Sequence, residues 1–325
     1  MKSKNLSEKI LSSVKSKGFK YIELPSVIEA NHIVQRSGEN FRKFMFSFTD
    51  INGKELCLRP DLTIASCLRY LENNLKGKEK IFYNGQVYRK VQSKKDKIIR
   101  NQVGFDILGS KDEKKDDKEI INTSIKILQD LKFSSGTLTI GNIEIFNLLI
   151  SKLDIPKRWK LRLSRHFWRE EYFNDLLKRL ETNADIDPTI VEIDKKRYLD
   201  LLNKNPETMI AGRSVGEILK RFDTKIKDPR QAKRVNKVSK IIKSFLKISC
   251  PINKAAMEIN KFFKKNKINL VVDQRYFPIS SNKLSKLNVK FSTSFGRHLE
   301  YYSGMVFKID VKSKLTSIKL SLIHI

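Results

Sequence analysis

The chain has 325 residues, 40% of them hydrophobic and 31% charged, which is typical of a globular protein with one large domain or two of ordinary size. No run approaches the roughly 20 apolar residues of a membrane span. The first residues, Met1 to Leu6, lack the apolar stretch of a signal peptide. We therefore expect a cytoplasmic protein without membrane contact.

The net charge of +30, from 66 basic and 36 acidic residues, raises nucleic acid as a partner. Most of the basic residues are lysines spread over almost every segment, and no basic stripe is interleaved with aromatic residues. A basic pI alone provides electrostatic attraction and no base readout. A solvated surface of biased composition explains the charge, so nucleic acid is not expected as a partner.

Neither the cysteines nor the histidines have the spacing of a metal or redox site. The three cysteines are an odd number and widely separated, which predicts reduced thiols. The four histidines are equally scattered. We therefore predict no metal and no cofactor. The residues concerned are Cys57, Cys67, Cys250, His32, His166, His298 and His324.

The first part of the chain alternates helix and strand signals. Residues 6–17 carry apolar side chains at helical spacing and stop at Gly18, which predicts an amphipathic helix. The Asn52-Gly53 pair between two apolar segments is a strong hairpin signal. The next elements expected are strands at 19–25, 27–29, 44–50, 55–59, 81–88 and 98–107, with a helix at 62–75.

The middle of the chain reads as mostly helical. A mixed-charge turn at 111–118 leads to a predicted helix at 119–131, then a strand at 137–142 and a helix at 143–153. Almost everything from 156 to 263 has helical character. A basic segment there carries Trp159, Phe167 and Trp168 at helical spacing, which is more typical of a core than of a cofactor site. Strands are expected again at 268–272, 289–292 and within 296–309.

Four polar side chains near the ends of the early strands could project into one pocket. Asp61 could hold an ammonium group, and Arg89 offers a planar fork for a carboxylate or phosphate. Gln102 can donate and accept, and Asp106 could receive an imidazole or amide N–H. The set suits an amino acid, although each residue taken alone could be a solvated strand end.

Four segments follow one another in a fixed order: Leu-Arg-Pro-Asp-Leu-Thr at 58–63, Gly-Gln-Val-Tyr-Arg at 85–89, Gln-Val-Gly-Phe-Asp at 102–106 and Arg-His-Leu-Glu-Tyr-Tyr-Ser-Gly-Met-Val-Phe at 297–307. In this order they resemble the catalytic core of class II histidyl-tRNA synthetases. They resemble still more closely the non-aminoacylating relative of these enzymes, the regulatory subunit of ATP phosphoribosyltransferase, which is the first enzyme of histidine biosynthesis.

The resemblance implies a pocket for histidine, with charge-assisted hydrogen bonds at one end and an aromatic edge at the other. The implied contacts are Asp61 and Thr63 to the α-ammonium group, Arg89, Gln102 and Arg297 to the α-carboxylate, and Asp106 with Tyr301 or Tyr302 to the imidazole.

Three departures from a working synthetase favour the regulatory relative. Asp61-Leu62 replaces Glu-Gly, and Arg89 precedes Lys-Val-Gln-Ser in place of Glu-Arg-Pro. No glycine follows Gly304, so the Gly-rich motif and an anticodon-binding domain are missing. Catalysis on ATP needs such groups to neutralise phosphate charge. Arg297, however, stands where synthetases keep a catalytic arginine, and residues 312–325 resemble the abrupt end of a fragment, which weakens the third departure.

The resemblance thus implies a non-catalytic regulatory subunit. It would bind and activate the short-form ATP phosphoribosyltransferase catalytic subunit and mediate feedback inhibition by L-histidine, as a homodimer within a hetero-oligomer. One alternative is a histidyl-tRNA synthetase fragment that activates histidine with ATP. Another is an amino-acid sensor acting on a different partner.

The implied fold is α+β, with a class II aminoacyl-tRNA synthetase-like antiparallel β-sheet flanked by helices and a helical insertion. We expect residues 1–150 and 265–325 to form the synthetase-like core and residues 151–264 to form the insertion.

Overall fold

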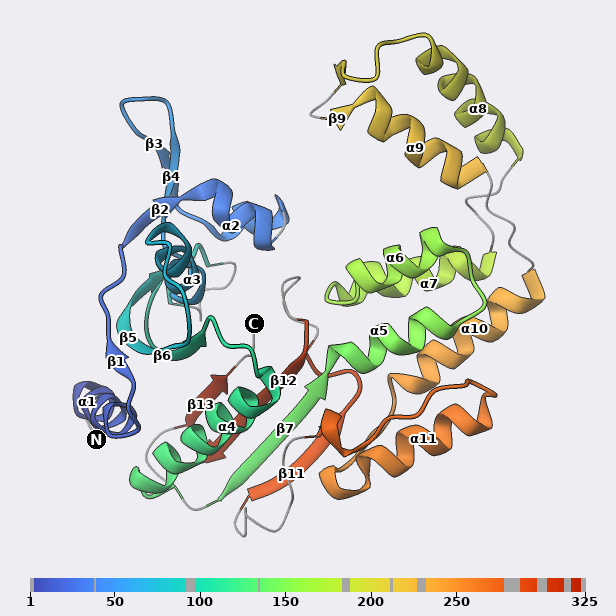
Figure 1. The fold of residues 1–325 in the computed structure, drawn as a ribbon. Helices are drawn as coiled ribbons and strands as arrows, with labels where there is room; N and C mark the ends of the chain where they lie inside the picture. Colours follow the sequence, from blue (N-terminus) through green and yellow to red (C-terminus); the bar gives the residue numbers. More distant parts are fainter. Residues whose placement is uncertain are drawn as a thin grey trace.

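The elements of the fold come from a computed structural model, which describes residues 3–37, 39–91, 97–133, 135–182, 188–210, 213–226, 232–277, 287–296, 303–312 and 317–322. Figure 1 shows the N-terminal elements on one side and most of the later helices on the other.

The helices that the structure describes are α1 (Ser3–Lys15), α2 (Ala30–Ser37), α3 (Thr63–Glu72), α4 (Glu113–Asp130), α5 (Ile143–Lys152), α6 (Lys157–Arg165), α7 (Glu170–Thr182), α8 (Pro188–Leu202), α9 (Val215–Ile226), α10 (Ala232–Phe245) and α11 (Ala255–Lys265). The strands are β1 (Lys20–Tyr21), β2 (Val27–Glu29), β3 (Ser47–Thr49), β4 (Glu55–Leu58), β5 (Glu79–Tyr88), β6 (Ile99–Leu108), β7 (Gly136–Asn142), β8 (Met209–Ile210), β9 (Arg213–Ser214), β10 (Ser249–Pro251), β11 (Leu287–Ser292), β12 (Met305–Lys312) and β13 (Ser317–Leu322).

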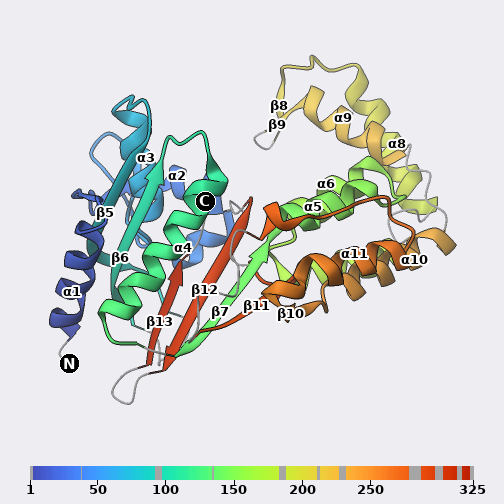
Figure 2. The ribbon, with the colours of Figure 1, turned by 60° about the horizontal axis from the view of Figure 1, so that its bottom comes forward.

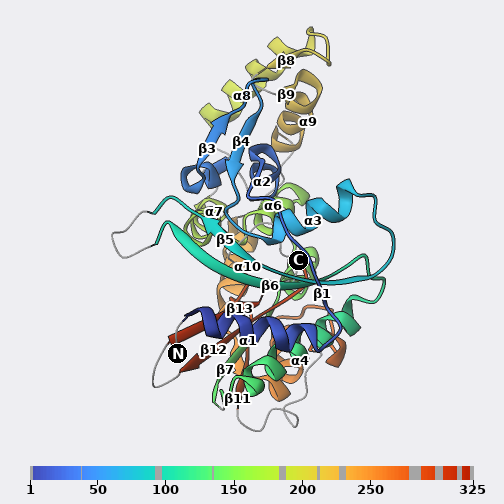
Figure 3. The same cartoon turned by 90° about the vertical axis from the view of Figure 1, so that its left-hand side faces the viewer.

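The long hairpin of β5 and β6 forms most of the first sheet, and β1 pairs with β5 in parallel. Side chains alternate between the two faces of a strand. One face of the hairpin carries Phe82 and Phe105, which share a core with Val14 of α1 and Ile127 of α4. Figure 3 shows α1 and α4 on this side of the hairpin. The other face carries Ile81, Tyr83 and Val87, which pack with Leu62 at the start of α3.

The predicted hairpin at Asn52-Gly53 is confirmed. β3 and β4 pair in antiparallel fashion, and β2 lies on the other side of β4. Gly53 has φ +79°, a conformation that glycine adopts readily. The Asp50 carboxylate accepts the backbone N–H groups of Asn52 and Lys54, both at 2.8 Å. Arg59 follows the end of β4, and its carbonyl accepts the N–H of Tyr88 at 3.0 Å, which places it beside the β5–β6 hairpin.

The second sheet has five strands in the order β10-β11-β7-β12-β13. Its pairs are antiparallel except for β11 with β7, which is parallel. Helix α4 connects the two sheets, because Ile127 joins the core beneath β5 and β6 while Ile121 and Leu128 join the core of β7. Figure 2 shows α4 between the N-terminal hairpin and the strands β7 and β12.

The largest core cluster runs from the second sheet into the helices that follow β7. It includes Trp159, Leu163 and Phe167 from α6 and the turn after it, and all three are buried. The expectation that the aromatic residues of this segment are core is confirmed for Trp159 and Phe167. Helices α8 and α9 pack on each other and stand away from the rest in Figures 1 and 2.

The α+β class is confirmed, with helices packed on strands that are distributed over small sheets. The division into a core of residues 1–150 and 265–325 and an insertion of residues 151–264 stays a prediction. Strand β10 and helix α11 lie within the range assigned to the insertion, and both pack with the second sheet.

Two local predictions are wrong for identifiable reasons. The segment 111–118 is not a turn throughout, because α4 begins at Glu113, where the Asp112 side chain accepts the N–H of Lys115 at 3.2 Å. Residues 268–272 form no strand. The side chain of Asn260 instead binds both the N–H and the carbonyl of Val272, each at 2.8 Å, and so replaces a strand neighbour.

Within the described ranges, none of the helices has the length and apolar character needed to cross a membrane.

Candidate functional site

The first side chain of the candidate site, Asp61, is fixed by the start of helix α3. Its carboxylate accepts the backbone N–H of Ile64 at 3.0 Å, and the residue is only 7% exposed. Burial raises the pKa of Asp61, whereas the N–H groups of Ile64 and Thr63 and the positive charge of Arg89 lower it. Asp61 is thus an acceptor held in place at the N-terminus of a helix.

Arg59, two residues earlier, anchors the loop that carries Asp61. Its guanidinium group donates to the carbonyl of Gln86 at 2.8 Å and to the carbonyls of Leu24 and Pro25. Gly85 makes room for it, because a Cβ at that position would lie 2.4 Å from the guanidinium nitrogen. Arg59 is buried and all three acceptors are backbone carbonyls, so its role is structural.

Arg89 closes the same loop from the other side. Its Nε donates to the carbonyl of Pro60 at 2.7 Å, and its guanidinium group lies 5.9 Å from the ring centre of Phe41. The positive charge of Arg89 lowers the pKa of Asp61. The arrangement places a cation next to the carboxylate that would meet an ammonium group, with the rest of the guanidinium fork available for a carboxylate.

Asp106 lies opposite Ile81 in the β5–β6 hairpin, on the face that does not carry Phe82 and Phe105. The hydroxyl group of Tyr83 donates to it at 2.9 Å. Burial raises the pKa of Asp106 to about 6, the hydroxyl groups of Ser66 and Tyr83 lower it, and the charge of Asp61 raises it. Asp106 is therefore a carboxylate whose charge changes close to the pH at which an imidazole also titrates.

Gly104 makes this contact possible. It lies opposite Tyr83 in the β5–β6 ladder, and a Cβ on it would be 2.4 Å from the tyrosine ring. We expect Gly104→Ala to lower the free energy of unfolding by about 1–3 kcal/mol, because the ring would have to move. Urea denaturation tests this. Gly216→Ala is the control, since its Cβ would meet neighbours only at 3.6 Å or beyond, and an equal loss there would contradict the explanation.

The structure brings five of the eight predicted site residues to one region. Thr63 interacts with the Tyr83 hydroxyl group, which in turn binds Asp106, and Asp61 affects the pKa of both Tyr83 and Asp106. Gln102 lies opposite Gly85 on the same face of the hairpin as Asp106. The remaining three predicted residues, Arg297, Tyr301 and Tyr302, lie outside the described residues.

Two side chains at this site were not predicted from the sequence. Tyr83 binds Asp106, and Ser66 is a fully buried serine in α3 close to it. Tyr83 is hidden in an apolar strand of ordinary appearance. A glycine opposite an aromatic residue in an antiparallel ladder is the one signal that could have indicated it. Ser66 has no such signal.

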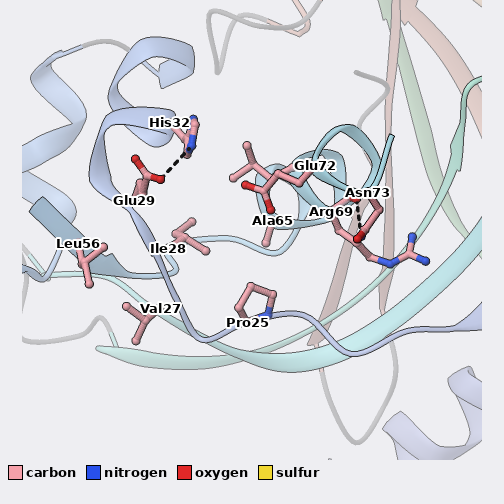
Figure 4. A pocket seen from close by; sticks show the side chains of 11 residues that line it. Pro25, Val27, Ile28, Glu29, His32, Leu56, Ala65, Arg69, Glu72 and Asn73 are labelled. Atoms are coloured by element: carbon pink, nitrogen blue, oxygen red, sulfur yellow. Dashed lines mark hydrogen bonds and ion pairs between the residues drawn. The ribbon is translucent and has the colours of Figure 1, made fainter. Parts of the chain in front are cut away.

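A pocket of about 430 Å³ lies on the far side of α3, between β2, β4 and α2 (Figure 4). Its floor is apolar and its rim carries Glu29, His32, Arg69 and Glu72. None of the predicted histidine-binding residues lines it. The candidate site and this pocket are therefore two different places on the same helix.

The described part of the chain holds no group of three or more histidine, cysteine, aspartate or glutamate side chains placed to bind a metal ion. Two of the cysteine thiols are also unlike metal ligands, which must be deprotonated. Burial raises the pKa of Cys57 and of Cys67 to about 11 each, so both stay protonated at neutral pH.

Comparison with known proteins gives consistent matches. The chain is 26% identical, over 94% of its length and 86% of the relative's, to an ATP phosphoribosyltransferase regulatory subunit from Allorhizobium ampelinum. Its fold is similar to that of an ATP phosphoribosyltransferase regulatory subunit/histidyl-tRNA synthetase from Bacillus halodurans, with a TM-score of 0.56 and 17% identity over 98% of this chain and 70% of that one. It is also similar to a chain of the ATP phosphoribosyl transferase complex from Thermotoga maritima, with a TM-score of 0.52 and 16% identity over 98% of this chain and 90% of that one.

The family model for histidyl-tRNA synthetase matches residues 1–317, and the chain therefore belongs to the histidyl-tRNA synthetase family.

Proposed function

We propose that this chain is a non-catalytic regulatory subunit of ATP phosphoribosyltransferase, in the cytoplasm, and that it binds and activates the short-form catalytic subunit. The observation that carries the proposal is the match to a curated relative of that name across 94% of the chain. The similarity in fold to a chain of an ATP phosphoribosyl transferase complex supports the same partner.

The effector in this proposal is L-histidine, bound between α3 and the β5–β6 hairpin. Asp61 with Thr63 receives the α-ammonium group, and Arg89 with Gln102 receives the α-carboxylate. Asp106 accepts an imidazole N–H. The buried carboxylates and the neighbouring guanidinium group support this assignment, because opposite charges at fixed positions suit a zwitterion. Arg297 for the carboxylate and Tyr301 or Tyr302 for the imidazole complete the proposed pocket.

The proposal that the chain is non-catalytic is supported by residues that differ from those of a synthetase at the start of α3 and after Arg89. Leu62 stands where a synthetase has glycine, and it is 1% exposed in a cluster with Ile81, Tyr83 and Val87. It therefore fills space at the start of α3. The residues after Arg89 also lack the Glu-Arg-Pro expected around an adenylate. A site that activates an amino acid with ATP must stabilise phosphate charge, and these positions do not provide for it.

Regulation requires two states with different contacts to the effector. In this proposal the chain forms a homodimer within a larger hetero-oligomer, and histidine favours the state in which the catalytic subunit is inhibited. The association is testable directly. Mixing the chain with the short catalytic subunit from the same source is expected to give a complex that is larger than either component in light scattering. Separate elution of two folded proteins at micromolar concentration would contradict the proposed partnership.

The second candidate is a histidyl-tRNA synthetase activity, which the family match itself favours. The measurement that separates the two is histidine-dependent exchange of pyrophosphate into ATP. We expect no exchange above background, because the nucleotide-binding groups described above are missing. Exchange that depends on histidine and is lost in Asp106→Ala would establish the synthetase and remove the non-catalytic role.

A further inference from the structure

The environment of Asp106 contains two hydroxyl groups with no other assigned role. Tyr83 is 2% exposed and its hydroxyl group donates to Asp106 at 2.9 Å. Ser66 is fully buried, and its hydroxyl group has no hydrogen-bond partner within the described residues. It nevertheless lies close enough to Asp106 to lower the pKa of that carboxyl group. An unpaired buried hydroxyl group costs folding free energy, so its presence here calls for a function.

The two hydroxyl groups approach Asp106 from different elements. Tyr83 comes from β5 and Ser66 from α3, while Asp106 itself comes from β6. Thr63 also lies close enough to the Tyr83 hydroxyl group to lower its pKa. Gly104 leaves the space that the ring occupies. The Tyr83 hydroxyl group thus binds the carboxylate from β5, and the Ser66 hydroxyl group on α3 lies near enough to affect it.

We propose that Tyr83 and Ser66 are positioning residues that hold the Asp106 carboxylate ionised and oriented towards the imidazole N–H of bound histidine. The proposal rests on the proposed function, because it takes histidine as the ligand of this site. A donor to a carboxylate stabilises its charged form and leaves its second oxygen free to accept from a ligand. The two residues therefore lower the pH below which histidine is lost, against the effect of burial.

The other groups around Asp106 do not account for such a limit. Among the described residues, Asp61 is the further carboxylate that acts on Asp106, and its charge raises the pKa of Asp106, opposite to the effect of the two hydroxyl groups. Cys67 on α3 stays protonated over the relevant range, since burial raises its pKa to about 11. The positive charge of Arg36 on α2 lowers the pKa of Cys67, but burial outweighs this effect. Within the part of the chain that the structure describes, the hydroxyl groups of Ser66 and Tyr83 are the groups that favour the charged form of Asp106.

The test measures histidine binding by calorimetry between pH 5 and 8 with the full chain. In Tyr83→Phe the ring still fills the space beside Gly104, while the donor is lost. If the pKa of Asp106 then rises by about one unit, histidine affinity falls about fivefold at pH 6 and less than about twofold at pH 8. Ser66→Ala is expected to shift the affinity in the same direction.

The controls match each change outside the site. Tyr70→Phe removes a hydroxyl group that donates to the carbonyl of Gly77 on the protein surface. Ser124→Ala removes a buried serine hydroxyl group that donates to the carbonyl of Ile120. Neither control should change the pH dependence of histidine affinity. Because free histidine titrates in the same range, only the difference between variant and wild type is interpreted.

A double variant makes the test specific to Asp106. In an Asp106→Asn background, Tyr83→Phe should change histidine affinity by less than about twofold, because the group that it positions is gone. Equal losses of affinity at pH 6 and pH 8, or the same loss in both backgrounds, would overturn the proposal. If Tyr83→Phe fails to fold, Ser66→Ala provides the same pH comparison.

The outcome also separates this inference from the proposed function. A wild-type chain that activates the catalytic subunit and binds histidine, with variants that behave like their controls, refutes the inference alone. A wild-type chain that binds histidine with the predicted pH dependence but activates nothing refutes the regulatory role alone. A wild-type chain that binds no histidine refutes the inference and the proposed effector, while activation remains a separate result.

Discussion

Asp106→Asn is expected to stabilise the folded chain at pH 7.5 by roughly 1–3 kcal/mol while lowering histidine affinity at least about tenfold. Stability and binding change in opposite directions because the same buried charge is costly in the free protein and useful in the complex. A neutral amide removes the cost. It also removes the charge that attracts the imidazole N–H.

The pH dependence follows from the pKa of Asp106, which burial raises to about 6 from an ordinary value near 4. Between these values the folded chain binds the proton more tightly than the unfolded chain does. The cost of ionising Asp106 is therefore absent below about pH 4 and complete above about pH 6. The gain in stability from the amide should grow over this interval and remain constant at higher pH.

Thermal unfolding at pH 4, 6 and 7.5 checks this account, and a rise in Tm of roughly 2–4 °C at pH 7.5 is the expected size. Asp175→Asn is the control, because Asp175 is an exposed partner of Arg179 on α7. A variant that is destabilised at pH 7.5, or whose stability relative to wild type does not change with pH, would contradict the assigned environment of Asp106.

Arg59→Ala is expected to cause the largest loss of stability, roughly 3–5 kcal/mol. The substitution leaves the carbonyls of Leu24, Pro25 and Gln86 without their donor. It also opens a cavity beside Gly85. Arg59→Lys should recover only part of the loss, because an ammonium group on a flexible stem does not reproduce a planar fork.

Urea denaturation measures this loss through the midpoint of unfolding. The control is Arg275→Ala, since the side chain of Arg275 is 73% exposed and pairs with Asp273 on the surface, where ion pairs contribute little. A midpoint for Arg59→Ala equal to that of the control would show that the loop before α3 is held by other contacts.

The sequence predicted those parts of the fold in which local signals agree with tertiary packing. The Asn52-Gly53 turn is one example, because the positive φ it requires is a property of the residues themselves. Residues 268–272 are the opposite case. Their apolar alternation suits a strand, but the Asn260 side chain occupies the hydrogen-bonding groups of Val272, a contact that depends on where α11 lies. Strand β13 was missed altogether.

The candidate site was predictable where charge and spacing stand out. Asp61, Arg89 and Asp106 are charged residues near the ends of apolar strands, and the structure gives each a defined environment. Tyr83 and Ser66 were not predictable, because a tyrosine in a strand and a serine in a helix are ordinary residues. Their importance arises only when β5, β6 and α3 come together. Assigning roles within the site therefore required the register of the hairpin.

The most direct test of the central claim is phosphoribosyl-ATP formation by the short catalytic subunit from the same source, measured alone, with this chain, and with this chain plus histidine. The account predicts little activity alone, a clear increase with the chain, and a decrease when histidine is added. An increase that histidine does not reverse would leave activation and remove the effector site from the account. No increase with a folded, full-length chain would contradict the regulatory role.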